Sequence, residues 1–218
     1  MLKAPVGSAP ASAREEAALR LVAAAQVPGV VRLLAAATDP PLLVLADVGG
    51  GPTLADRLLA DDPAAAEMAV LDWAARLGGL QAVTTGAREE FASRLAGLSA
   101  LGAAPVDTLH DAVAEACAVL ARDLPRLEVP VTPSAHEELR ELALMLDVTA
   151  PGAPGAPGAL VPGDTCPSNA VDSDDGLVLL DFEGAEFRHL AWEAAHSRCP
   201  GRPAGAAGNC RNRSPPGR

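Results

Sequence analysis

Residues 160–185 read LVPGDTCPSNAVDSDDGLVLLDFEGA, and no other part of the chain carries so much chemical information. Asp164 and Asn169 stand five positions apart in a loop that contains Gly and Pro, and Asp181 follows an apolar run. Between them, the sequence Asp-Asp-Gly at 174–176 is the kind of turn that a tight hairpin requires. The pattern predicts that a β-hairpin returns Asp181 to the neighbourhood of Asp164 and Asn169.

The side chains of this stretch match what phosphoryl transfer from a nucleotide requires. One carboxylate must orient the attacking hydroxyl and accept its proton, while an Asn and a second carboxylate hold the Mg²⁺ that neutralises the phosphates. An isolated D-x-x-x-x-N pattern has little weight, because Asp and Asn are common in loops. The alternative is a structural hairpin with capping acids, and the combination of the loop, the hairpin and Asp181-Phe182 favours the phosphotransferase interpretation.

The stretch resembles the catalytic region of the aminoglycoside and small-molecule phosphotransferase family, which has the protein-kinase-like fold. In that family the loop reads H-G-D-x-x-x-x-N, and a following strand ends in D-F or D-W. The resemblance implies that Asp164 is the catalytic Asp and that Asn169 and Asp181 bind Mg²⁺. It also implies that ATP is the donor and that a small-molecule hydroxyl, as on an aminoglycoside or similar amino-sugar, is the acceptor.

The resemblance continues more weakly upstream. Residues 43–49 (LVLADVG) look like the hinge strand between the two lobes, whose backbone, at Leu45 and Asp47, receives the adenine. Lys3 stands where the family has its phosphate-binding Lys, and Glu15 stands where the family has its helical ion-pair partner.

Glu15 also has a local interpretation. Ser12-Ala13-Arg14-Glu15 has the form of a capping box, which predicts a helix that begins there and runs to about Ala25. Glu16 is then a substitute for Glu15 as the partner of Lys3, and a terminal residue such as Lys3 is often frayed.

The fold class expected is α+β, a protein-kinase-like two-lobed fold with a mostly helical C-terminal lobe and an incomplete N-terminal lobe. Residues 1–47 would form the partial nucleotide-side lobe, and residues 48–196 the lobe with the catalytic loop and the metal-binding hairpin. Residues 197–218 contain five Arg, no acid and no large apolar residue, so we expect this basic tail to be disordered.

Capping and periodicity predict the individual elements. The first are a buried strand at 42–45 and a short helix capped by Thr53. A long helix starts at Asp62-Pro63 and is expected to bury Val70, Leu71, Ala74, Leu77 and Leu80. Further helices are expected at 108–121, from Ser134 and at about 187–196.

The chain departs from the family pattern in several places. Pro162 replaces the His before Gly-Asp, Ala46 replaces the usual hinge acid, and Gln81 replaces a His on the long helix. No glycine-rich segment precedes Lys3, and few residues follow the hairpin, so the chain looks like a kinase fold truncated at both ends. The alternative function is therefore a catalytically inactive protein that binds nucleotide weakly or serves as an interaction module.

Composition limits the partners. The 28 acidic and 17 basic residues give a net charge of −11, which argues against nucleic acid and suits a cationic acceptor. The four cysteines show no metal-binding spacing and are expected to be free thiols. No uninterrupted apolar run is long enough for a membrane span, so we expect no membrane association and a cytoplasmic protein.

Overall fold

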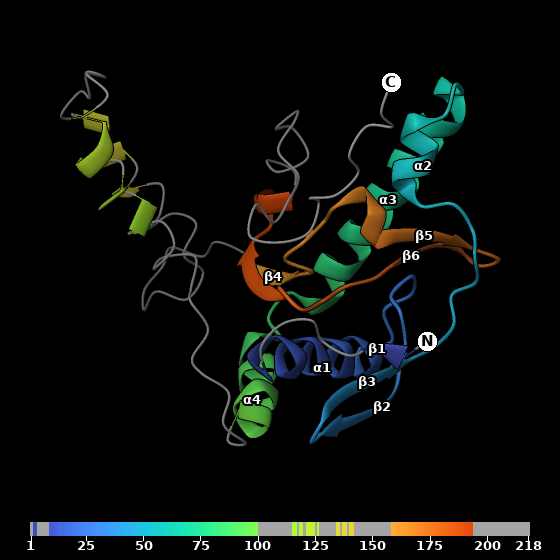
Figure 1. Ribbon diagram of the computed structural model, residues 1–218, viewed down its shortest axis with the longest axis horizontal. Coiled ribbons are helices and arrows are strands. Elements are labelled where there is room, and N and C mark those ends of the chain that lie inside the picture. The colour runs from blue at the N-terminus through green and yellow to red at the C-terminus, as the bar shows by residue number, and fades with distance from the viewer. Residues whose placement is uncertain are drawn as a thin grey trace, which may run out of the picture.

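The computed structural model describes residues 2–3, 9–99 and 158–193, together with some residues between 115 and 141. Within these parts the fold is mixed α+β, with helices and small antiparallel sheets (Figure 1). The predicted helices at 108–121 and from Ser134 are described only in part, and the tail 197–218 lies outside the described residues.

The first sheet has three antiparallel strands in the order β1-β3-β2. They are β1 (Leu2–Lys3), β2 (Leu33–Thr38) and β3 (Pro41–Leu45). Leu43 and Leu45 point into the core, at 0% and 1% exposure, which confirms the predicted buried strand. Alternate residues of a strand face opposite sides, so these two leucines share the face that packs against α1 (Ala9–Ala24).

Helix α1 begins earlier than predicted. It starts at Ala9, so Ser12 lies inside the helix rather than at its N-cap, and the predicted capping box is wrong. Ser12 and Glu15 are 5% and 1% exposed, which shows that they belong to the packed face of the helix. The motif was misleading because Ser and Glu three residues apart also lie on one helical face.

Three helices follow: α2 (Leu54–Leu59), α3 (Pro63–Thr84) and α4 (Arg88–Ser99). The caps are as predicted, since Thr53 forms a capping box with Asp56 and the Asp62 side chain accepts from Ala65 N at 3.0 Å. The predicted inner face of α3 is only partly correct. Its C-terminal half buries Leu77 and Leu80, whereas Val70, Leu71 and Ala74 are exposed.

The C-terminal part forms two small sheets. Hairpin β5–β6 pairs Ala170–Ser173 with Gly176–Leu179, as the turn sequence predicted. Strand β4 (Gly158–Val161) pairs with β7 (Glu186–His189), so the helix predicted from about Phe187 is wrong over these residues. Phe187 lies opposite Leu160 and is buried, because β4 supplies a pairing edge that a local helix pattern does not reveal.

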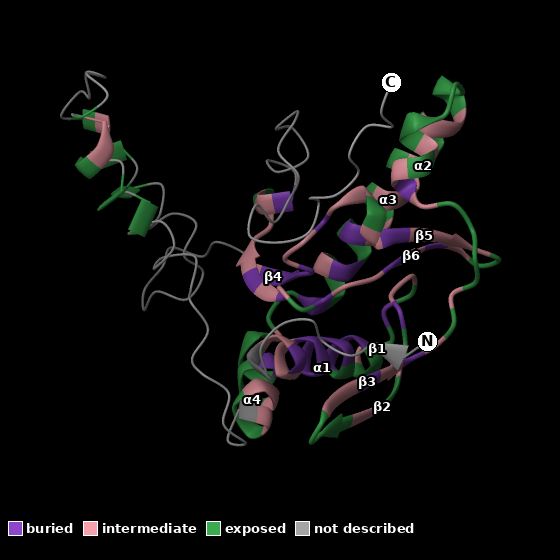
Figure 2. Cartoon of the chain, in the orientation of Figure 1, coloured by how far each residue is buried: buried purple, intermediate pink, exposed green. Residues whose placement is uncertain are grey.

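One hydrophobic core joins the two parts of the chain. The buried residues of α1, β3 and α3 contact those of β4 and β6, and Phe182 is completely buried among them. Figure 2 shows this buried region along α1 and in the strands and the part of α3 above it in this view, while α2 and the adjoining end of α3 are largely exposed. None of the described helices has the length and apolar character needed to cross a membrane.

Candidate functional site

The loop after β4 holds Asp164 and Asn169 together. The Asn169 side-chain nitrogen donates to the carbonyl oxygen of Asp164 at 3.2 Å, and Asn169 N donates to Cys166 O at 2.8 Å. One carboxylate oxygen of Asp164 accepts from Cys166 N at 3.0 Å. Since the amide nitrogen of Asn169 is turned toward that carbonyl, its amide oxygen points away and can serve as a ligand.

Hairpin β5–β6 returns the chain to the same place. Ala170 lies opposite Leu179, and Leu180 N donates to Asn169 O at 2.8 Å. Asp181 is therefore the first residue beyond the hydrogen bond that closes the hairpin. Its φ of 61° lies in the left-handed region, so the backbone turns sharply at this carboxylate.

A close contact between two glycines brings the loops of Asp164 and Asp181 against each other. Gly163 has a φ of 87°, and a Cβ on it would collide with the carbonyl group of Gly184. Gly184 belongs to the turn after Asp181, where Ala185 N donates to Phe182 O at 3.0 Å. The structure thus places Asp164, Asn169 and Asp181 on adjoining backbone segments, as the sequence predicted.

These three residues offer oxygen donors of the kind that Mg²⁺ prefers, namely two carboxylates and an amide. Within the described parts of the chain, no group of three or more His, Cys, Asp or Glu side chains is arranged to hold a metal ion. Magnesium binding by Asn169 and Asp181 stays a prediction.

Glu15 reaches the same region from α1. Its carboxylate is 1% exposed and lies 3.4 Å from the backbone nitrogen of Phe182, the residue after Asp181. Glu16 instead forms an ion pair with Arg20 at 2.8 Å on the same helix. Of Glu15 and Glu16, it is therefore Glu15 that faces the candidate site.

The backbone of Lys3 pairs with Leu43 in the first sheet. The Lys3 side chain lies outside the described part of the structure, so its predicted pairing with Glu15 stays a prediction.

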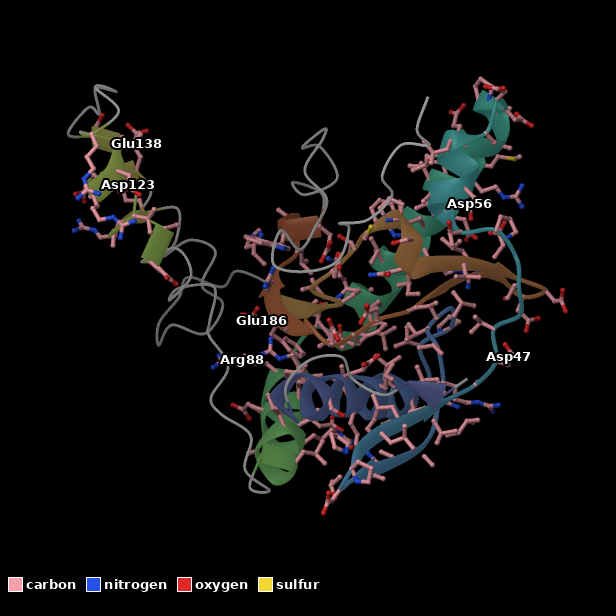
Figure 3. The ribbon with its side chains drawn as sticks, viewed as in Figure 1. Asp47, Asp56, Arg88, Asp123, Glu138 and Glu186 are labelled. Carbon is pink, nitrogen blue, oxygen red and sulfur yellow. The ribbon has the colours of Figure 1, made fainter. Side chains whose placement is uncertain are left out.

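The predicted hinge residues lie at the end of β3. The Leu45 side chain is buried, so that residue can meet a ligand only through its backbone. Ala46 N donates to Arg32 O at 2.8 Å. Because backbone groups alternate along a strand, those of Leu45 face the other side of β3, on which β1 pairs. Asp47 is exposed on the connection between β3 and α2, where its carboxylate accepts from Gly49 N at 3.1 Å (Figure 3).

A cavity of about 590 Å³ lies beside this connection. Its lining comes from residues 29–32, from residues 46–51 and from the hairpin around residues 172–175. Asp47 lines the cavity, whereas Asp164, Asn169 and Asp181 do not. The cavity lies at the end of the hairpin where the turn is. The three candidate catalytic residues lie at the opposite, open end of the hairpin.

Sequence reasoning missed the residues that hold the hairpin in place. The Arg57 guanidinium binds Asp172 at 2.5 and 2.8 Å across 115 positions of sequence, and thereby ties α2 to β5. Asp172 N also donates to Pro52 O at 2.9 Å. An Arg and an Asp so far apart leave no local signal, so only a three-dimensional structure could pair them.

Comparison with known proteins gives no independent support for a family. No family model matches the sequence, and no curated protein is similar enough to it to count as a relative.

Proposed function

We propose that this protein is an ATP-dependent phosphotransferase that moves the γ-phosphoryl group to a hydroxyl of a small molecule, on a protein-kinase-like two-lobed fold. One observation carries the proposal. Asp164 and Asn169 are hydrogen-bonded within one loop, and the hairpin after it returns Asp181 to that loop, where Gly163 and Gly184 are in contact.

Each residue of this site has a distinct role. Asp164 orients the acceptor hydroxyl and takes its proton, and Asn169 and Asp181 bind the metal through oxygen atoms. When bound, Mg²⁺ neutralises the charge that develops on the phosphates during transfer. The buried Glu15 holds α1 beside the turn after Asp181, and the resemblance makes it the partner of Lys3.

The donor and acceptor have different recognition elements. The backbone at Leu45 and Asp47 would receive the adenine, and Lys3 would contact the phosphates. The net charge of −11 favours a cationic acceptor, and an aminoglycoside or related amino-sugar combines positive charge with the hydroxyl groups that the reaction needs.

Metal-dependent nucleotide binding tests the proposal first. At a ligand concentration of about 100 Kd, Mg²⁺·ATP stabilises the native state by ~2.7 kcal/mol, which raises the Tm of a protein of this size by about 5–10 °C. Asp181→Asn removes a charged metal ligand, so we expect little shift in that variant. Thermal denaturation with and without EDTA measures both.

Asp61→Asn is the matched control, because Asp61 is exposed between α2 and α3, does not line the cavity beside Asp47, and is expected to leave the shift unchanged. Equal shifts in wild type and Asp181→Asn, or no shift in wild type, would contradict the proposal.

Where binding survives, Asp164→Asn should reduce ATP turnover with an amino-sugar acceptor by at least about 100-fold. Unchanged turnover would exclude Asp164 as the base.

A second candidate is a catalytically inactive nucleotide-binding or interaction module. Pro162 favours it, because a proline before Gly163-Asp164 has no side-chain donor with which to brace the loop. A metal-dependent ATP shift without turnover on a panel of amino-sugars would select this candidate.

A further inference from the structure

An ion pair on α3, formed by Arg76 and Asp72, contacts both sides of the β5–β6 turn. Arg76 donates to Asp72 at 3.3 Å and to the carbonyl oxygen of Asp175 at 3.3 Å, and its side chain is 23% exposed. The other carboxylate oxygen of Asp72 accepts from Leu177 N at 3.1 Å. The ion pair therefore binds the backbone of the hairpin on both sides of Gly176.

The Arg76 side chain also fills the space between the hairpin and the segment that follows α1. A Cβ added to Gly29 would lie 2.5 Å from Arg76 Cδ, and one added to Gly176 would lie 2.5 Å from its Nη2. Both glycines thus leave room for this side chain and no more. Arg76 therefore lies between the hairpin turn and the segment around Gly29, and it contacts both.

Strand β6 connects this contact to the candidate site. Leu179 N donates to Gly29 O at 2.8 Å, and Val31 N donates to Leu179 O at 3.0 Å. Leu179 precedes Asp181 by two residues, and β6 is only four residues long. A shift of the hairpin turn would therefore move the backbone that carries Asp181.

We propose that Arg76, together with Asp72, is a positioning residue that holds hairpin β5–β6 against α3 and residues 29–31 and so sets the location of Asp181. The role in metal binding rests on the proposed function. The pair is suited to this task because charge-assisted hydrogen bonds to backbone groups are directional, and because the arginine packs its stem against Gly29 and its guanidinium against Gly176.

The first measurement needs no ligand. Backbone amide exchange, followed by NMR, should be at least 10-fold faster at Leu177 and Leu179 in Arg76→Gln than in wild type, with the amides of β2 and β3 unchanged. Asp72→Asn, which removes the charge at constant size, should act in the same direction and serves if Arg76→Gln does not fold. Unchanged exchange at Leu177 and Leu179 would overturn the proposal.

The second measurement separates positioning from mere stability. At fixed ATP, the Mg²⁺ concentration for a half-maximal Tm shift should rise at least 5-fold in Arg76→Gln, and Arg76→Lys should recover part of the loss. Arg94→Gln is the matched control, since Arg94 forms an ion pair of the same spacing with Glu90 on α4. We expect that variant to keep the wild-type Mg²⁺ dependence.

The two proposals fail in different ways. Faster exchange with an unchanged Mg²⁺ requirement would overturn the positioning role while leaving the proposed function intact. A wild-type protein without any Mg²⁺·ATP shift would contradict the proposed function, and the exchange rates alone would then decide whether Arg76 positions the hairpin.

Discussion

Individual backbone conformations determine the geometry of the candidate site. Gly163 and Asp181 both have positive φ, at 87° and 61°. Gly163 makes the contact between the two loops, and Asp181 begins the turn that contains its partner Gly184. Such a conformation costs a residue with a side chain about 1–2 kcal/mol, which explains why a glycine stands at the tighter of the two positions. Asp181 adopts this conformation at the position that the proposed function assigns to a metal ligand.

Substitution of Gly163 tests this contact. Gly163→Ala should lower the free energy of unfolding by ~1–3 kcal/mol more than Gly86→Ala, as measured by urea denaturation. Gly86 has nearly the same φ, 85°, but open space around it, so it reports the backbone cost alone. Equal losses in the two variants would show that the loops of Asp164 and Asp181 are not in contact.

Neighbouring elements are joined by a few buried polar contacts. Thr84, at the end of α3, is 0% exposed, donates to Leu80 O at 2.7 Å and accepts from Leu160 N at 3.1 Å. The last contact fixes β4, and β4 leads directly into the loop of Asp164. A single hydroxyl therefore links the long helix to the strand before the candidate site.

Thr84→Val should destabilise the protein by ~1–3 kcal/mol, because it keeps the shape of the side chain but leaves the buried Leu160 N–H without its acceptor. The neighbouring Thr85 is the control. Its hydroxyl donates to Gln81 O at 2.8 Å on an exposed surface, so Thr85→Val should change stability by less than about 0.5 kcal/mol. Chemical denaturation of both variants measures their free energies of unfolding. Equal losses in the two variants would contradict a structural role for the Thr84 hydroxyl.

On the scale of the whole molecule, α4 closes the core between the two halves of the chain. It packs against α1, and the ring of Phe91 lies 5.6 Å from that of Phe187 on β7. Through β7 and β4 this contact reaches the loop of Asp164. The N-terminal helix that carries Glu15 and the strands that flank the candidate catalytic residues are thus parts of one core.

Removal of the Phe91 ring should therefore affect the whole molecule. Phe91→Ala should lower the free energy of unfolding by ~3–5 kcal/mol in a single transition, because a buried ring is replaced by a cavity. Leu59→Ala, at a position that is 85% exposed, should change it by less than about 0.5 kcal/mol. Two separate transitions in wild type, by circular dichroism, would contradict a shared core.

The elements predicted correctly all have a strong local signal. Asp62-Pro63 caps α3, Thr53 caps α2, and the turn at 174–176 forms the β5–β6 hairpin. The convergence of Asp164, Asn169 and Asp181 follows from that hairpin, since its length and register decide where the chain returns. These features depend on hydrogen bonds between residues close in sequence, so their pattern is visible in the sequence.

The features that were wrong or absent depend on distant partners. Phe187 is in a strand because β4 lies beside it. Val70 is exposed because α3 packs through other residues, among them Ala69, Trp73 and Leu77. β2 and α4 were not predicted. The sequence already favoured Glu15 over Glu16, but the burial of Glu15 beside Phe182 and the attachment of Arg76 to the hairpin depend on distant partners too. Local hydrogen bonding and turn chemistry therefore specified the loop and hairpin of the candidate site, whereas burial and pairing between remote segments specified which side chains support it.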